Sequence, residues 1–296
     1  MTKDILAFVL LVACPAFSQI SSGTSIVITL TNDELVVAAD SRSVEDGPGS
    51  PADNSHCKIV VLHHQFIFTS VGSVRFRKAN PASIVESWDN AEVARDALKN
   101  ATNALIVNDA YMDAVLTYWA QIVENHWNTL CRLERSRCMN TIVPTGPLGL
   151  VGLGAQRAQM TAGIFVGARG LFAKAATIDF DSDWSKAFNP IDHNIVAVSQ
   201  CQPCGQGEQV CAAGSHLDVA AQFCSDRKPG TKPSVRTVLT KADDHAKLAV
   251  EIVEKTIDAY ERTAGDVGGP VDAVTITKDG RITWNSRKTN CPENQD

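Results

Sequence analysis

Apolar positions in the first part of the chain follow strand-like patterns. Residues 25–30 (SIVITL) and 35–39 (LVVAA) flank the turn-forming stretch TNDE, so we expect them to form a hairpin. Residues 58–62 (KIVVL) and 65–71 (QFIFTSV) predict a third and a fourth strand. Residues 43–56 lie between the second and third strands; they are rich in Gly, Pro, Ser and Asp and predict a loop.

The apolar spacing then changes to that of helices. Residues 91–107 and 111–131 carry apolar side chains three or four positions apart, which predicts two amphipathic helices. We expect the tryptophans of the second helix to pack in the core. Two further helices are predicted at 216–224 and 246–260.

Strand signals return after the first pair of helices and again at the end of the chain. Because strand blocks and helix blocks are segregated, the pattern favours an α+β fold over alternating βαβ units. We expect two antiparallel sheets that are covered by helices on both outer faces. The later strands are predicted at 148–153, 159–166, 171–178, 195–199 and 210–213, with a closing hairpin at 271–277 and 281–284.

Composition and charge exclude several classes of protein. With 44 % hydrophobic and 20 % charged residues, the 296-residue chain can form a packed core, so general disorder is excluded. The net charge is −6 and basic residues do not cluster, so we expect no nucleic-acid partner. No apolar run reaches the roughly 18 residues of a transmembrane helix, so we expect no membrane span.

The first eighteen residues have the character of a signal peptide. Lys3 precedes a nearly continuous apolar run at 5–14, and the small residues at positions 16 and 18 fit a cleavage site after Ser18. We therefore expect a secreted or periplasmic protein. Two alternatives stay open: a lipid anchor on Cys14, which ends a lipobox-like LVAC, and a buried N-terminal segment.

Export changes how the cysteines are interpreted. Nine are present, and eight remain once Cys14 is removed with the signal peptide. An even number in an oxidising compartment favours disulfides, with local pairs expected at Cys131/Cys138 and within 201–224. The alternative is a zinc site formed by the four cysteines of the 201–224 segment. A redox role for its CQPC motif is disfavoured, because a Gly-rich stretch follows in place of a helix.

The stretch GTSIVITLTNDELVVAADSR at 23–42 resembles the start of a proteasome β-type subunit, within the N-terminal nucleophile (Ntn) hydrolase superfamily. Thr24 and Asp40 are sixteen residues apart, and Lys58 and Gly72 are fourteen apart, as in that family. The resemblance is specific over residues 23–73. It implies a four-layer αββα sandwich of two antiparallel sheets between helical layers. The chain would divide into a signal peptide (1–18), a short propeptide (19–23), an Ntn hydrolase domain (24–286) and a C-terminal tail (287–296).

The resemblance implies a catalytic set that is also chemically coherent. Once the chain is cut before Thr24, the new α-amine can act as base for the Thr24 hydroxyl, because its ordinary pKa is about 7.7–8.0. Lys58, held as a cation by Asp40, would lower the pKa of that amine and stabilise developing negative charge. The Gly72 N–H would be the oxyanion donor.

Four further residues complete the expected site. Ser215 follows Ala213-Gly214 and resembles the family's auxiliary serine, with Ser199 as a fallback. Gly23 would let the Thr24 hydroxyl reach its carbonyl during autocleavage, and Arg42 would give structural support. The sequence departs from the family pattern at 263–269, where Asp266 is displaced and the family's serine is absent.

These residues predict an exported, self-processing threonine hydrolase that cleaves peptide or amide bonds through an acyl-enzyme on Thr24. It would require no metal or organic cofactor, and assembly into a homo-oligomer is left open. A non-catalytic assembly or binding protein on the same fold is the first alternative. An amidase or acylase of the same superfamily, acting on acyl-amide or γ-glutamyl substrates, is the second. A protein whose cysteine-rich segment is the functional part is the third.

Overall fold

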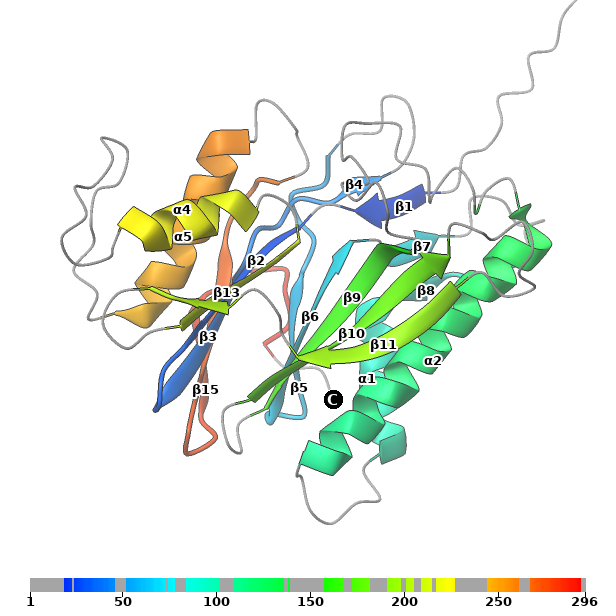
Figure 1. The fold of residues 1–296 in the computed structure, drawn as a ribbon, viewed down its shortest axis with the longest axis horizontal. Coiled ribbons are helices and arrows are strands. Elements are labelled where there is room, and N and C mark those ends of the chain that lie inside the picture. Colours follow the sequence, from blue (N-terminus) through cyan, green and yellow to red (C-terminus); the bar gives the residue numbers. More distant parts are fainter. Residues whose placement is uncertain are drawn as a thin grey trace, which may run out of the picture.

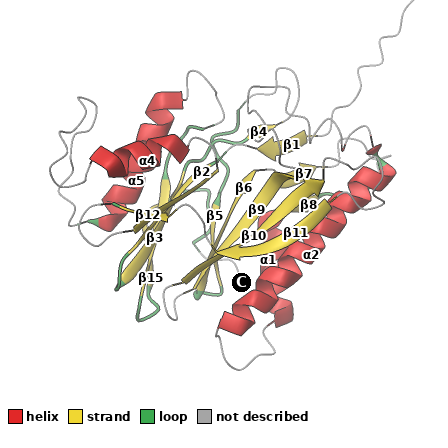
Figure 2. Ribbon diagram, in the orientation of Figure 1, coloured by secondary structure: helices red, strands yellow, loops and turns green. Residues whose placement is uncertain are grey.

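The computed structural model describes most of the chain downstream of residue 18. The described residues are 19–22, 24–45, 52–72, 74–77, 84–101, 109–135, 138, 157–167, 172–181, 191–197, 201–204, 209–214, 217–226, 244–260 and 267–293. Two large antiparallel sheets and four helices of eight or more residues form most of this part of the chain, and they give an α+β fold (Figures 1 and 2).

The first large sheet has six strands in the order β12-β13-β2-β3-β14-β15. Its centre is the predicted hairpin, whose turn is closed by the Thr31 hydroxyl accepting the N–H of Glu34 (3.1 Å). Every neighbouring pair is antiparallel, and Ile26 faces Ala39 across the hairpin. The strands are β2 (Ser25–Leu30), β3 (Glu34–Ala39), β12 (Cys201–Pro203), β13 (Gln209–Gly214), β14 (Asp272–Thr277) and β15 (Ile282–Ser286).

The second large sheet has five antiparallel strands in the order β11-β10-β9-β6-β5. The long strands β9 and β10 pair along almost their whole length, from Arg157 opposite Asp181 to Gly167 opposite Phe172. The strands are β5 (Ile59–Leu62), β6 (Phe66–Gly72), β9 (Arg157–Gly167), β10 (Phe172–Asp181) and β11 (Ile191–Ala197).

Three apolar clusters hold these layers together. One joins the two sheets face to face and contains Ile28, Val37, Ile67 and Ile164. A second packs α4 (Leu217–Asp226) and α5 (His245–Tyr260) on the outer face of the six-stranded sheet. The third packs α1 (Asn90–Ala101) and α2 (Asp109–Leu133) on the outer face of the five-stranded sheet. Figure 1 shows the two helix pairs on opposite sides of the molecule.

Packing explains which face of α2 is buried. In α2 the buried residues Val115, Trp119, Val123, Trp127 and Leu130 recur every three or four positions, so one stripe of the helix meets the sheet. The expectation that both tryptophans lie in the core is therefore confirmed. None of the described helices is long and apolar enough to cross a membrane.

A third, small sheet was not expected from the sequence. It has the order β4-β1-β7-β8 and consists of β1 (Gln19–Ser22), β4 (Val44–Glu45), β7 (Arg75–Arg77) and β8 (Trp88–Asp89). The two large antiparallel sheets are as expected, and this small sheet is additional to them. The loop expected over 43–56 is wrong at residues 44–45, which form β4. Strands of two to four residues have no periodicity of their own, because they form only where neighbours pair with them. The strand predicted at 148–153 lies outside the described residues.

Three disulfide pairs have both side chains in the described part of the chain, and two of these are expected local pairs. Cys131 pairs with Cys138 and Cys204 with Cys224, while the third pair joins Cys57 to Cys291, 234 residues apart. Cys211 is also disulfide-bonded. The alternative of a zinc site in the 201–224 segment is therefore wrong, because at least three of its four thiols are already oxidised.

Candidate active site

The Asp40 carboxylate organises the candidate site. Asp40 follows β3 directly and is fully buried. Its Oδ1 accepts the Lys58 ammonium and the Ser25 N–H, each at 2.8 Å. Its Oδ2 accepts the N–H of Gly268 (3.0 Å) and of Arg42 (3.2 Å). Four donors thus compensate the burial of this anion, and they come from four separate parts of the chain.

Lys58 is an equally unusual residue for a protein core. It directly precedes β5, and its side chain is 1 % exposed where it meets Asp40. Lysine is almost never buried unless its charge is paired, so this ion pair accounts for the position of Lys58. An isolated lysine at the start of a strand would ordinarily extend into solvent. The packing of β3 and β5 in facing sheets instead buries both partners.

Thr24 lies at the same end of the six-stranded sheet. It is 1 % exposed, and its peptide bond to Ser25 carries the N–H that binds Asp40. Gly214 packs against it with φ +95°; a Cβ there would stand 2.0 Å from the Thr24 carbonyl oxygen and 3.3 Å from Val71. Only glycine therefore fits, and its presence brings Thr24 close to the end of β6.

Gly72 ends β6 in a conformation that favours glycine. Its φ is +78°, and a Cβ would meet the Met160 carbonyl oxygen at 2.3 Å. The preceding carbonyl, that of Val71, accepts the Thr161 hydroxyl (2.7 Å), which in turn accepts the Asn90 amide (3.1 Å). Because the peptide unit is planar and trans, the Gly72 N–H points the opposite way from that carbonyl. Its direction is thus fixed by buried hydrogen bonds.

Arg42 ties two loops together beside this carboxylate. Its Nε donates to Asn54 Oδ1 (2.9 Å), and its Nη1 donates to the Val267 carbonyl oxygen (3.2 Å). Gly268 lies flat against the guanidinium, where a Cβ would come within 2.5 Å of Cζ. Arg42 therefore links the segment of Asn54 to the segment of Val267 and Gly268, which is a structural role.

His56 is the titratable group next to the Lys58 segment. Burial, together with the nearby Arg75 cation, lowers the pKa of His56 to about 4. An Arg75 guanidinium nitrogen stands 3.0 Å from His56 Nδ1, and Arg75 also pairs with Asp89 (2.9 Å). Since arginine can only donate, Nδ1 accepts, and the imidazole is neutral with its proton on Nε2. The neutral imidazole therefore adds no positive charge beside Lys58.

Three of the expected site residues are thus brought together. Thr24, Asp40 and Lys58 converge, with Gly72 nearby at the end of β6. Gly23, Ser215, Ser199 and Asp266 lie outside the described residues. Two residues of the site were not predicted from the sequence: Gly214, which packs against Thr24, and Gly268, whose N–H binds Asp40. In the sequence they are only a glycine at the end of a strand and the first residue of a Gly-Gly pair. Neither feature indicates a contact with the site.

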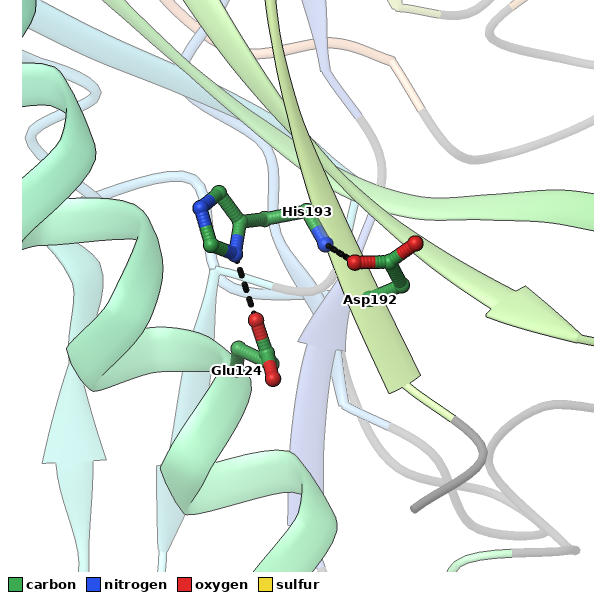
Figure 3. A group of neighbouring side chains, drawn as sticks. All are labelled: Glu124, Asp192 and His193. Atoms are coloured by element: carbon green, nitrogen blue, oxygen red, sulfur yellow. Dashed lines mark hydrogen bonds and ion pairs between the residues drawn. The ribbon is translucent and has the colours of Figure 1, made fainter. Parts of the chain in front are cut away.

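A second group of ionisable side chains joins α2 to the edge strand β11 (Figure 3). His193 Nδ1 is hydrogen-bonded to Glu124, and the His193 N–H donates to Asp192 Oδ1 (2.8 Å). One turn along α2, Asn128 bonds to both the N–H and the carbonyl of Ile191 (3.1 Å each). The potential metal ligands lie within 4.8 Å of one another. The Glu124–His193 and Asn128–Ile191 bonds already serve to hold β11 against α2. We assign them a structural role.

No protein-family profile and no curated protein matches this chain. Among solved structures, the chain is similar to eukaryotic HslV from Trypanosoma brucei. The match covers 86 % of this chain and 99 % of that one, with 12 % identity and a TM-score of 0.42. A similarity this distant assigns no role to a residue, so the roles proposed below rest on the contacts described above.

Proposed function

We propose that this protein is a self-processing threonine hydrolase of the Ntn type, with Thr24 as nucleophile. The proposal rests chiefly on one observation: a single buried oxygen, Asp40 Oδ1, binds both the Lys58 ammonium and the N–H next to Thr24. A buried lysine is costly for a fold to maintain, and here it is held beside a hydroxyl residue at the start of a strand. Such a lysine is suited to act on that residue.

The first reaction would be cleavage of the chain itself. The Thr24 hydroxyl attacks the Gly23 carbonyl carbon, the C–N bond breaks, and the acyl group moves from nitrogen to oxygen. Water then hydrolyses the resulting ester, which releases the Gly23 carboxylate and leaves Thr24 with a free α-amine and a free hydroxyl. That amine is the base required for later turnovers, since a threonine hydroxyl is a weak nucleophile by itself.

In each later turnover the α-amine would take the proton of the Thr24 hydroxyl as it attacks the substrate carbonyl. Lys58 stabilises the negative charge and lowers the pKa of the amine, and Asp40 keeps Lys58 in place. The Gly72 N–H, whose direction is fixed by the Val71–Thr161 hydrogen bond, would donate to the oxyanion. The leaving amine takes the proton, and water hydrolyses the acyl-enzyme.

The substrate class follows from the segment that precedes Thr24. β1 lies between β4 and β7 and pairs antiparallel with both; Ser21 stands opposite Glu45 on one side and Arg75 on the other. Loss of this segment on self-cleavage would leave a slot one strand wide, with unpaired main-chain groups on both sides. An extended peptide can bind such a slot through its main chain. We therefore propose peptides as substrates, with smaller amides as poorer ones.

Several broader assignments belong to the same proposal. The layered arrangement of helices and sheets supports the four-layer αββα Ntn sandwich. The disulfide pairs are compatible with an oxidising, extracellular or periplasmic location. Residues 1–18 would be the signal peptide, 19–23 the propeptide and 24–286 the hydrolase domain.

A fluorogenic substrate built on the chain's own propeptide tests the activity. We expect the mature protein to release the fluorophore from Gln-Ile-Ser-Ser-Gly-aminomethylcoumarin. Thr24→Ala should abolish this activity and Lys58→Ala should block turnover. Thr31→Ala, in the turn at the far end of β2, should be fully active. Activity of Thr24→Ala equal to that of the wild type would show that Thr24 is not the nucleophile.

A further inference from the structure

The last described residues of the chain return to the candidate site. Residues 287–293, which we call the C-terminal clasp, follow β15 and are fixed by the disulfide between Cys291 and Cys57. Cys291 is 2 % exposed. Cys57 is the residue immediately before Lys58. The covalent bond therefore attaches the last described segment of the chain to the backbone that carries the buried ammonium.

Further contacts join the clasp to both sides of the Asp40–Lys58 pair. The Lys288 N–H donates to Asp272 Oδ1 (2.9 Å), and its ammonium bonds both to Asp272 Oδ2 and to the hydroxyl of Ser41, the residue after Asp40. These Lys288 and Asp272 side chains are 8 % and 3 % exposed. The Asn290 amide donates to the carbonyl of Ser55 (3.0 Å), three residues before Lys58.

The backbone before Lys58 lies outside the two large sheets. Asp53 bridges to Ser43, and the side chains of Asn54 and His56 meet Arg42 and Arg75. Residues 54–58 form a turn and an irregular stretch and enter β5 only at Ile59. A lysine ammonium stands at the end of four flexible carbon–carbon bonds, so its position depends on where this backbone is held. Catalytic groups must keep their places to within about half an ångström. Of the described contacts, the disulfide is the one covalent restraint next to Lys58.

We propose that the C-terminal clasp is a positioning element of the catalytic site. The Cys57–Cys291 bond holds the Lys58 backbone, and Lys288 holds Ser41 beside Asp40, so that the Lys58 ammonium stays on Asp40. Full turnover therefore depends on an intact Cys57–Cys291 bond. An added dithiol reductant would convert the disulfide to two thiols and become a cyclic disulfide itself, and turnover would slow. This inference rests on the proposed function for its catalytic consequence, but the ordering of the Lys58 backbone can be measured without it.

The test compares two double variants of the full-length chain. Cys57→Ala/Cys291→Ala removes the disulfide beside Lys58, and Cys131→Ala/Cys138→Ala removes the one at the end of α2. We expect the first to lower kcat about ten- to a hundredfold with KM little changed. The acid limb of its kcat/KM profile should move to higher pH, because a displaced Lys58 no longer lowers the pKa of the amine. The second should match the wild type.

A second variant guards against a failure to fold. Lys288→Met keeps the disulfide, and we expect it to lower kcat and shift the pH profile in the same direction. Dithiothreitol should slow the wild type to the rate of Cys57→Ala/Cys291→Ala and leave that variant unaffected. If the variant with Cys57 and Cys291 replaced shows the kcat and pH profile of the control, or if both double variants lose activity equally, the proposal is overturned.

Hydrogen exchange separates this proposal from the proposed function. Amides of residues 53–62 should exchange faster in Cys57→Ala/Cys291→Ala than in the control, whether or not the protein has Thr24-dependent activity. Unchanged exchange overturns the clasp as a positioning element. Faster exchange in a protein whose Thr24→Ala variant is fully active would support the ordering of the Lys58 backbone and count against Thr24 as nucleophile.

Discussion

Replacing Lys58 by methionine would test the buried ion pair at the centre of the site. Methionine keeps most of the apolar stem, so the change removes the charge without opening a large cavity. Asp40 is then left as a buried anion with the N–H groups of Ser25, Arg42 and Gly268 as donors. Breaking a buried pair typically costs about 3–5 kcal/mol. Because three donors stay in place, we expect a loss near the lower limit, about 3 kcal/mol.

Removing the negative charge of Asp40 should destabilise the protein more than removing the positive charge of Lys58. Asp40→Asn leaves the Lys58 ammonium buried without a counter-charge, and it places an amide NH₂ against backbone N–H groups that need an acceptor. We expect a loss above about 4 kcal/mol. The double variant should lose clearly less than the two single losses together, because no unpaired charge is left in it.

Urea denaturation followed by tryptophan fluorescence measures these losses with the disulfides intact. All variants are made in a Thr24→Ala background, so that every sample has the same covalent form. Lys174→Met is the matched control, because Lys174 meets Asp113 at the same 2.8 Å but with side chains 24 % and 51 % exposed. Such a surface pair is worth at most about 1 kcal/mol. If Lys58→Met costs no more than Lys174→Met, the argument from a buried pair is refuted.

Two further predictions concern Gly214 and His56. Gly214→Ala should destabilise the protein by more than about 2 kcal/mol and abolish activity, because its Cβ would collide with the Thr24 carbonyl. Gly280→Ala, also at positive φ (91°) but in an exposed turn, should cost about 1 kcal/mol and keep activity. His56 has a pKa of about 4 when folded and about 6.5 when unfolded, so the unfolded chain binds more protons between these pH values. The free energy of unfolding should therefore fall by up to about 3 kcal/mol as pH drops from about 6.5 to about 4. His56→Gln should remove this pH dependence, which urea titrations across the range would measure. An unchanged pH dependence in that variant would contradict the lowered pKa of His56.

Much of the scaffold could be predicted because its signals are local. The hairpin of β2 and β3 has two apolar runs on either side of a turn sequence, and it forms where expected. The helical stripe of α2 is visible over several turns and corresponds to the buried face. In such segments one periodic pattern determines both the secondary structure and the surface that is buried.

The parts that could not be predicted depend on contacts between distant residues. The Gly268 N–H reaches Asp40 across 228 positions, and Cys291 reaches Cys57 across 234. A glycine pair or a late cysteine gives no information about its partner, because many pairings fit one sequence. β1 is a polar segment that becomes a strand because β4 and β7 pair with both of its edges.

The central claim is that Thr24 is a nucleophile that first acts on its own chain. The most direct test is the intact mass, with N-terminal sequencing, of the wild-type protein and of Thr24→Ala, each exported from its own signal. The wild-type chain should begin at Thr24, and the Thr24→Ala chain should still carry residues 19–23. A wild-type chain that begins at Gln19 would contradict this claim.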